Sequence, residues 1–325
     1  MKANVHTKYG PPEVLQLKEV RKPIPKDDEV LIRIFATTVN RTDCAILYGK
    51  PFLTRFASGL FKPKSPITGT DFAGKVEGIG KCVTSLKVGD KVWGFNDNGL
   101  TSHAQYMTIS EDKAITTIPN NITYVQAAAS AEGTHYAYNF IKKVNLESGH
   151  SVLVNGATGA IGSAAVQFLK YYKANVTAVC DTENIELVKS LGADRVIDYI
   201  NEDFTRDDQK YNFIFDTVGK SSFSKCKPLL HPGGVYISSE LGYMLQNLFY
   251  ALVTPIFGNQ KVIFPFPTDI KGSILFVKDL IEKGEYKPLI DRKYPLEGID
   301  QAYMYVASGQ KIGNVIIIFD DNMEA

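Results

Sequence analysis

The feature that most constrains this chain is a glycine-rich segment between a strand-like run and a helix-like run. Residues 151–170 read SVLVNGATGAIGSAAVQFLK, and Gly156, Gly159 and Gly162 follow the pattern G-x-x-G-x-x-G. Glycine permits a tight turn and lets the backbone approach a pyrophosphate without an intervening Cβ. The following helix offers free N–H groups and the positive end of its dipole. We therefore predict a dinucleotide-binding turn. The expected backbone donors are those of Ala160 and Ile161.

The surrounding pattern supports this interpretation. Strand-like runs alternate with helix-like runs every 20 residues or so, which is typical of βαβ units and a parallel sheet. The strand-like runs are 151–155, 175–179, 195–199, 212–219 and 234–239, with 261–266 as a candidate last strand. The second strand ends at Asp181, 19 residues after Gly162, where a carboxylate can accept hydrogen bonds from ribose hydroxyls. A glycine-rich turn without a nucleotide is the alternative, and this context disfavours it.

The remaining chain has a different rhythm. Short alternating runs separated by Gly, Pro and Asp fill the first third, which indicates antiparallel strands in a small barrel or sandwich. The segment 124–144 reads as one helix, and after Pro267 two helix-like runs precede a closing strand at 313–319. The tail resembles the first third. We therefore expect a domain formed by residues 1–122 and 268–325, split around a doubly wound dinucleotide-binding domain at 123–267.

Composition narrows the function classes. The 325 residues carry a formal net charge of +1 and are 44% hydrophobic, so neither nucleic acid nor an anionic membrane is an expected partner. Four widely spaced cysteines argue against a zinc ribbon or a disulfide framework. The apolar stretch 241–257 contains Gln, Asn, Thr and Pro, so we expect a buried helix at a pocket or subunit interface, with a loose membrane contact second and no integral span. A cytoplasmic location is the default expectation.

Several motifs in order make the chain resemble the medium-chain dehydrogenase/reductase superfamily, in its zinc-independent quinone oxidoreductase-like branch. They are GTDFAGKVEGIG (69–80), VGDKVWG (88–94), GATGAIG (156–162), LGADRVIDY (191–199), FDTVG (215–219) and GNVIIIF (313–319). The resemblance covers nearly the whole chain. It implies a mainly-β GroES-like catalytic domain split around a Rossmann domain. It also implies an NAD(P)H-linked oxidoreductase that forms a homodimer.

The resemblance also bears on metal. Zinc-dependent relatives place a cysteine, a histidine and a third ligand where this chain has Asn40, Thr70 and approximately Ala131 or Glu132. Asn and Thr are poor zinc ligands beside thiolate and imidazole, and the cysteine-rich lobe of many relatives is missing. We therefore predict no zinc. A shifted site built on Cys44 and His135 is the disfavoured alternative, since zinc needs three or four convergent ligands.

The catalytic candidates follow from position. Asn40 is the first candidate for a polar group at the nicotinamide, and equally a cap for the helix that starts at TDCAILYG. His135, next to Thr134, is a candidate proton shuttle, although a buried structural histidine is the favoured reading. Tyr48 is a weaker substrate-contact candidate. Hydride transfer to a quinone or conjugated enone delocalises the developing charge, so a few placed donors suffice.

The cofactor candidates give a mixed signal on phosphate preference. The segment CDTENIE at 180–186 carries Asp181 and Glu183 and no cation, and these carboxylates would repel a 2′-phosphate, which favours NADH. Tyr199, or Arg195 if its side chain extends to the 2′-phosphate, would favour NADPH. We lean slightly to NADH. The remaining cofactor candidates are Thr182 and Asn184 in that segment, Thr217 and Val218 under the nicotinamide, Ser238 and Ser239 on the next strand, and Asn314 in the tail.

The resulting function hypothesis is a zinc-independent NAD(P)H-dependent oxidoreductase acting on a small, apolar quinone, enone or related carbonyl. The apolar 241–257 stretch would wall the substrate site. Two alternatives stay open: a zinc-type alcohol dehydrogenase with displaced ligands, and a nucleotide-binding protein of the same fold that has lost turnover.

Overall fold

The computed structural model describes residues 1–52 and 54–319, and it divides the chain into two compact units. We call Gly133–Thr268 the inserted unit, and Met1–Glu132 together with the chain from Asp269 the split unit. The first boundary lies ten residues later than the expected 122/123. The reason is that helix α3 (Tyr124–Ala129) packs against strands of the split unit, chiefly β3 (Glu29–Val39) and β4 (Asp71–Ile79).

The inserted unit is built on a parallel sheet. Among the described residues its strand order is β10-β9-β8-β11-β12-β13, which is the doubly wound order 3-2-1-4-5-6 in chain sequence. The strands are β8 (Ser151–Asn155), β9 (Asn175–Cys180), β10 (Arg195–Asp198), β11 (Tyr211–Asp216), β12 (Leu230–Ser238) and β13 (Lys261–Ile263). The strand order reverses between β8 and β11, and ligands of such sheets bind at the carboxyl ends of the strands beside this point. The fold-class prediction is confirmed for this unit.

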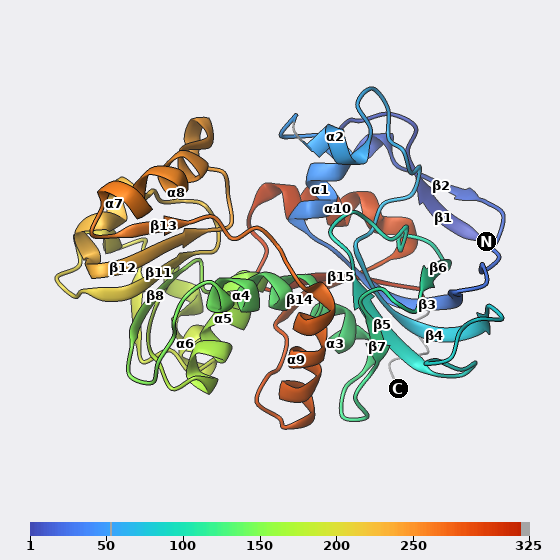
Figure 1. Ribbon diagram of the computed structural model, residues 1–325. Helices are drawn as coiled ribbons and strands as arrows, with labels where there is room; N and C mark the ends of the chain where they lie inside the picture. Colours follow the sequence, from blue (N-terminus) through green and yellow to red (C-terminus); the bar gives the residue numbers. More distant parts are fainter. Residues whose placement is uncertain (53, 320–325) are drawn as a thin grey trace. The chain divides into compact units, whose positions relative to one another are not determined.

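Helices cover both faces of that sheet. In Figure 1, α5 (Ala160–Tyr171) and α6 (Ile185–Ser190) lie along one face, and α7 (Phe223–Cys226) and α8 (Gln246–Phe257) along the other. Right-handed crossovers place the helices of each half on one face. The central strands are apolar on both sides because both faces are covered, and their core includes Leu153, Ile214 and Tyr236.

The split unit is mainly β, as the alternating pattern predicted. In the described part of the chain its main sheet has the order β14-β15-β3-β4-β5-β7, with β6 on β3, and β1 pairs with β2 separately. The strands are β1 (Lys2–Val5), β2 (Gln16–Glu19), β3, β4, β5 (Lys91–Phe95), β6 (Tyr106–Ser110), β7 (Ile115–Thr117), β14 (Ile290–Pro295) and β15 (Asn314–Ile318). Its helices, besides α3, are α1 (Arg41–Tyr48), α2 (Thr54–Ser58), α9 (Ile270–Glu282) and α10 (Ile299–Ser308).

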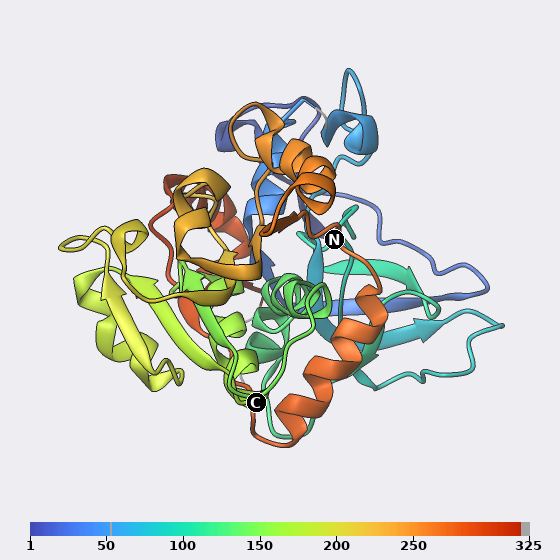
Figure 2. The same cartoon turned by 60° about the vertical axis from the view of Figure 1, so that its left-hand side comes forward.

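The tail completes this unit. Strand β15 pairs antiparallel with β3, from Val315 opposite Val39 to Ile318 opposite Ala36. Helix α9, the orange-red rod in Figure 2, contacts β5 and β7, and Lys278 Nζ donates to Thr117 Oγ1 at 2.8 Å. The last described segment therefore joins the first third of the chain in one sheet, as the similarity of their patterns indicated.

Two element predictions need correction. The single helix expected at 124–144 is two helices, α3 and α4 (Glu132–Lys142), because the chain turns at Ser130, whose Oγ donates back to Gln126 O at 2.7 Å. The last strand of the inserted unit covers only 261–263 of the expected 261–266. Pro265, which has no N–H, cannot extend the ladder.

The apolar stretch 241–257 forms the short 3-10 helix η5 (Tyr243–Leu245) and helix α8. No helix among residues 1–52 and 54–319 is long and apolar enough to cross a membrane. The expectation of a buried helix is wrong for much of this stretch, since several of its large apolar side chains are exposed. One face of α8 does pack on the sheet, through Tyr250 and Ala251.

Candidate functional site

The glycine turn of the inserted unit has the geometry that the sequence predicted. Gly156 has φ +83°, a left-handed conformation that favours glycine, and a Cβ there would lie 2.4 Å from Val218 Cγ1. A Cβ on Gly162 would lie 2.1 Å from the carbonyl oxygen of Gly156. Both glycines are therefore required by close packing, and together they hold the start of α5 against the ends of β8 and β11.

Gly159 has a different role. It is the N-cap of α5 with ordinary extended angles, and the atom nearest to a Cβ built there is Gly156 O at 3.5 Å. Gly159 has no side chain that could cap this helix, so the first-turn N–H groups, including those of Ala160 and Ile161, receive no side-chain cap from it. An uncapped helix start with a clear approach suits a pyrophosphate. The residues present therefore fit a dinucleotide.

The reversal point of the sheet is held by buried hydrogen bonds. Thr217 Oγ1 donates to Asn155 O at 2.8 Å, and Asn155 Nδ2 donates to Asp216 Oδ1 at 3.0 Å. Asp216 Oδ2 in turn accepts from Tyr236 OH at 2.9 Å. These contacts join β8, β11 and β12 at their carboxyl ends. Thr217 and Val218, both cofactor candidates, lie at the expected edge, and Thr217 turns its hydroxyl inward.

The next strand reaches the same edge. Ser239 N donates to Asp216 O at 3.1 Å, and Ser238 Oγ accepts from Glu240 N at 3.3 Å. Ser238 is buried, whereas Ser239 is partly exposed. The structure thus brings together the glycine turn, the 217–218 pair and the 238–239 pair at one edge of one sheet.

The adenosine end lies after β9. Asp181 Oδ1 accepts from Asn184 N at 3.1 Å and from Asn184 Nδ2 at 2.6 Å, so this carboxylate caps the turn 182–184. Thr182 Oγ1 donates to Asp198 Oδ2 at 2.6 Å, and this bond lowers the pKa of Asp198. Asp181 Oδ2 is left for a ribose hydroxyl. A 2′-phosphate bound there would instead be repelled by the carboxylates of Asp181 and Glu183.

Two cations near this segment, Arg195 and Lys189, could offset the negative charge of these carboxylates, but each forms an ion pair with another residue. Arg195 donates to Asp207 in a bidentate pair at 2.8 and 2.9 Å, and it stands at the amino end of β10. The hypothesis that Arg195 reaches a 2′-phosphate is therefore wrong, because ligands bind at the opposite edge of the sheet. Lys189 pairs with Glu186 at 2.8 Å. Tyr199 is 53% exposed at the carboxyl end of β10, where an adenine or ribose can contact it.

Helix α4 supports the glycine turn. A Cβ on Gly133 would lie 2.8–2.9 Å from atoms of Ala160, so the first turn of α4 touches the first residue of α5. Thr134 and His135 follow at once and have no exposed surface. This burial favours the structural reading of His135, a packing residue behind the turn, over a group that a substrate touches directly.

In the split unit, Asn40 is the N-cap of α1. Asn40 Oδ1 accepts from Asp43 N at 2.9 Å, and Asn40 N donates to Asp43 Oδ2 at 3.0 Å, which together form a capping box. Its amide Nδ2 also donates to Thr70 Oγ1 at 2.8 Å. The capping reading is therefore confirmed. The two positions where zinc-dependent relatives carry cysteine and histidine are joined here by a hydrogen bond.

A buried carboxylate anchors this arrangement. Asp71 Oδ1 accepts from Thr38 N at 2.7 Å, and Asp71 also accepts from the hydroxyls of Thr38 and Thr37. Burial raises the pKa of Asp71 to about 6, although these hydrogen bonds oppose the shift. Asp71 ties the end of β3 to the start of β4, and so fixes the backbone that leads into Asn40.

Two further carboxyl groups lie close by. Thr42 Oγ1 donates to Glu132 Oε1 at 2.5 Å, and burial, followed by repulsion from Asp43, raises the pKa of Glu132 well above its ordinary value. Burial and then the charge of Asp71 likewise raise the pKa of Asp43. Both pKa shifts are in the direction that favours protonation of the carboxyl group. Burial lowers the pKa of Lys311, which the charge of Glu132 opposes.

The structure disfavours the shifted zinc site. Cys44 is buried in the apolar cluster around Leu47 and Ile299, its Sγ lies 4.0 Å from Tyr303 O, and burial raises its pKa to about 12. Within the described ranges, no group of three or more His, Cys, Asp and Glu side chains is arranged to hold a metal ion. Tyr48 packs its ring partly against the same cluster.

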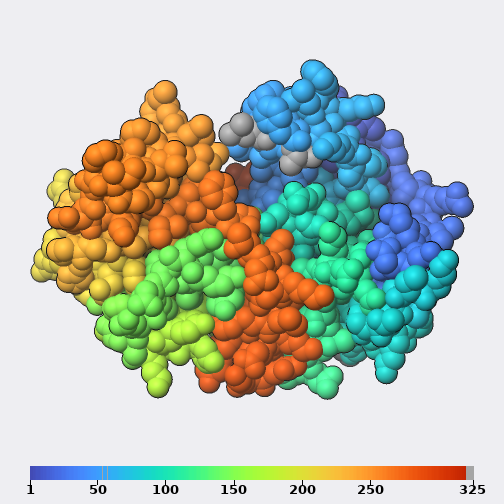
Figure 3. All heavy atoms as spheres, in the orientation of Figure 1, coloured from blue at the N-terminus to red at the C-terminus, as the bar shows by residue number. Residues whose placement is uncertain are grey.

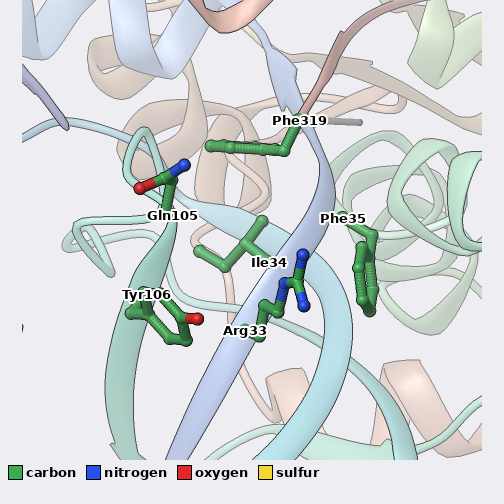
Figure 4. A pocket seen from close by; sticks show the side chains of 6 residues that line it. All are labelled: Arg33, Ile34, Phe35, Gln105, Tyr106 and Phe319. Carbon is green, nitrogen blue, oxygen red and sulfur yellow. The ribbon is translucent and has the colours of Figure 1, made fainter. Parts of the chain in front are cut away.

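The side chain of Asn314, a cofactor candidate, is hydrogen-bonded within the split unit. Its Nδ2 donates to Leu289 O at 3.0 Å, which fixes the start of β15. A cavity of about 80 Å³ elsewhere in this unit, shown in Figure 4, has room for two or three waters only. It is lined by Arg33, Ile34, Phe35, Gln105, Tyr106 and Phe319.

Sequence reasoning missed the buried carboxyl cluster. Asp43 stood only within the expected helix start TDCAILYG, Asp71 only within the motif at 69–80, and Glu132 only as an approximate zinc-ligand position. The available signal was the spacing N-x-x-D at 40–43, which predicts a reciprocal cap. Nothing in the sequence brings Lys311, 179 residues further on, beside Glu132.

Comparisons with known proteins agree with this geometry. Residues 26–138 match the alcohol dehydrogenase GroES-like domain, and residues 191–317 match the zinc-binding dehydrogenase family. A 2-methylene-furan-3-one reductase of Solanum lycopersicum is 32% identical, over 98% of this chain and 79% of that protein. An NADPH-dependent alkenal/one oxidoreductase of Arabidopsis thaliana, described as chloroplastic, is 30% identical over the same shares.

The fold is shared with solved structures. The quinone oxidoreductase of Escherichia coli, solved in complex with NADPH, superimposes with a TM-score of 0.81 at 24% identity, covering 98% of this chain and 100% of that one. One conclusion follows from the sequence relatives and the two family matches, and the similarity of fold agrees with it. The chain belongs to the medium-chain dehydrogenase/reductase superfamily, in its quinone oxidoreductase-like branch.

Proposed function

We propose that the protein is a zinc-independent, NAD(P)H-dependent oxidoreductase that reduces a quinone or a conjugated enone. The observation that carries this proposal is the uncapped start of α5 behind a glycine turn that only glycine can form, beside the hydrogen-bonded edge at Thr217. The names of the relatives, an alkenal/one oxidoreductase among them, support the acceptor class.

The bound nicotinamide would supply the hydride. The chain's own part is to bind and orient the cofactor: the N–H groups of Ala160 and Ile161 take the phosphates, and Asp181 accepts from the ribose. Thr217, Val218, Ser238 and Ser239 form the edge that supports the ring. Position and orientation are then the main catalytic contribution, since little covalent chemistry is asked of the protein.

The acceptor can be reduced without a Lewis acid. Asn40 and Thr70 occupy the positions of two metal ligands and bind each other instead, and neither is a good zinc ligand. Charge that develops on a quinone or an enone is delocalised, so a few placed hydrogen-bond donors suffice to stabilise it. Glu132 accepts a hydrogen bond from Thr42 and has a raised pKa, so it is the candidate proton reservoir.

Cofactor preference follows from charge. Asp181 and Glu183 follow β9, where the adenosine ribose is expected, and the cations Arg195 and Lys189 pair with Asp207 and Glu186. We therefore propose a preference for NADH, although one relative is named NADPH-dependent. We also propose a homodimer, as the resemblance to the quinone oxidoreductase-like branch implies. A cytoplasmic location stays a prediction.

The test has two parts. Purified protein is titrated with NADH and with NADPH, and the consumption of each is then followed against a panel of quinones and enones. Turnover with at least one acceptor is the expected result. Cofactor binding without any turnover would favour the non-catalytic alternative. Stoichiometric zinc in the purified protein, required for turnover, would favour the displaced-ligand alcohol dehydrogenase.

A further inference from the structure

The segment after β12 presents a continuous apolar surface. Its exposed large apolar residues, which we call the apolar strip, are Tyr243 (79% exposed), Met244 (82%), Leu245 (44%), Phe249 (60%), Leu252 (74%), Ile256 (72%) and Phe257 (82%). In Figure 3 this orange segment lies on the surface of the inserted unit. Contiguous apolar surface of this kind marks a binding site more often than isolated exposed residues do.

The strip spans η5 and α8, and three of its residues share one face of α8. Phe249, Leu252 and Ile256 follow the spacing i, i+3, i+7, which places them on the same side of α8. The opposite side packs inward, with the Tyr250 ring 5.3 Å from that of Phe223. The side chains of the strip therefore do not pack in the core of the unit. We infer that these apolar side chains contact a molecule outside the chain.

The strip adjoins the cofactor edge of the same unit. Asn247 Nδ2 donates to Glu240 O at 2.8 Å, and a Cβ on Gly219 would lie 2.2 Å from Glu240 Cγ. The chain thus passes from the 238–239 pair, beside the end of β11, straight into η5. One end of the strip lies next to the proposed nicotinamide edge, and the other lies along the length of α8, about 18 Å away.

The backbone at this end is held in an unusual conformation. Met244 and Leu245 have φ of +47° and +63°, in the left-handed region that residues with a Cβ rarely adopt. Consecutive outliers of this kind persist where the surrounding structure imposes them, and they cluster at ligand clamps. Here they aim exposed apolar side chains outward beside the cofactor edge.

Charge argues for an uncharged, apolar occupant. Residues 241–260 contain no Asp, Glu, Lys, Arg or His. An interfacial helix that binds an anionic membrane carries Lys and Arg on its polar face, which this segment lacks. A hydrocarbon chain that continues from an acceptor at the nicotinamide edge matches both the chemistry and the direction of the strip.

We propose that the apolar strip binds the hydrocarbon tail of the acceptor, so that the enzyme prefers enones or quinones with a long alkyl or prenyl chain. This inference rests on the proposed function and names its substrate class. Each methylene fully removed from water strengthens binding about fourfold. A surface strip covers only part of each methylene, so eight added methylenes predict a rise of at least tenfold in kcat/KM.

The test compares 1-alken-3-ones that share one reacting head and differ in tail length from one to nine carbons. In the wild type, kcat/KM rises at least tenfold along the series. In the double variant L252Q/I256Q, the ratio of long-chain to short-chain kcat/KM falls at least threefold. The matched control I24Q replaces an equally exposed isoleucine of the split unit and keeps the wild-type ratio.

Three outcomes would overturn the proposal. Equal kcat/KM along the series shows that the strip is not a tail site, while the proposed function stands. An unchanged ratio in L252Q/I256Q, with loss of dimer mass in sedimentation, shows that a second copy covers the strip. An unchanged ratio with loss of binding to phosphatidylglycerol vesicles shows that a membrane covers it.

Failure of the proposed function is recognised separately. If neither cofactor reduces any acceptor, binding of the saturated ketone 2-dodecanone is measured by calorimetry on the cofactor-loaded protein. Binding that weakens at least threefold in L252Q/I256Q and not in I24Q supports the strip as a tail site without turnover. Equal binding to all three proteins overturns it.

Discussion

The inserted unit and the split unit each contain a candidate site, and the two sites are built in opposite ways. The glycine turn of the inserted unit works through backbone, with N–H groups at an uncapped helix and glycines that allow close packing. The Asn40 region of the split unit works through buried side chains, among them Asp43, Asp71 and Glu132. The glycine turn depends on free space beside the glycine backbone, whereas the Asn40 region depends on carboxyl groups that are buried away from water. Perturbation should therefore act on geometry in one unit and on pH dependence in the other.

The largest expected effect tests the geometric half. The variant G156A places a Cβ in the left-handed region and 2.4 Å from Val218, so we expect a loss of about 3 kcal/mol or more of unfolding free energy and more than tenfold weaker NADH binding. The control G149A has a similar φ of +84° but open space, and we expect only about 1–2 kcal/mol. Urea unfolding and cofactor titration measure both. Equal losses in the two variants would contradict the packing argument.

The next effect tests the electrostatic half. Asp71 has a pKa of about 6 in the folded protein, above the ordinary 3.8, so the native state keeps a proton that the unfolded chain releases. The contribution of Asp71 to stability is then greatest below about pH 4 and is lost as the pH rises through 6. In D71N this loss disappears, and the fall in unfolding free energy between pH 4.5 and pH 7 should shrink by about 2 kcal/mol. Urea unfolding at both pH values measures it, and an unchanged fall would refute the assignment to Asp71.

A third prediction concerns the adenosine end. The variant D181N keeps a side-chain oxygen that can cap the turn 182–184 but removes a negative charge from the 2′ position. We expect the ratio of NADPH to NADH affinity to rise about tenfold, as removal of one charge repulsion of about 1.4 kcal/mol requires. The control D203N removes a carboxylate that caps a similar turn at 204–206. A shift of the same size in D203N would show that net charge alone sets the preference.

The smallest stability effect separates cap from catalysis at Asn40. Loss of the cap in N40A should cost about 1 kcal/mol, and T123A, which removes the capping box of α3, should cost a similar amount. If Asn40 also serves the acceptor, kcat falls at least fivefold in N40A with little change in NADH affinity, while T123A keeps its kcat. Equal kcat values in the two variants would leave Asn40 with the cap alone.

These two halves also differed in how far they could be predicted. The doubly wound sheet, the glycine turn and the edge residues Thr217 and Ser238 follow from local patterns, because strand, turn and helix signals repeat within about 20 residues. The fold class of both units was predicted correctly, and the cap was one of the two readings of Asn40, from its place ahead of the helix. Each of these depends on residues that are close in sequence.

What only the tertiary structure decided depends on distant residues. Arg195 could pair with a phosphate or with Asp207, and only the fold places its guanidinium at the amino edge, 12 residues from its partner. Burial raises the pKa of Asp71, which lies at the start of β4 and is bonded by Thr37 and Thr38 of β3. The strip on α8 was expected to be buried, and it is exposed because only one face of that helix meets the sheet. Local sequence thus determined the elements and the cofactor turn, whereas long-range packing determined which side chains are charged, which are committed and which are left for a ligand.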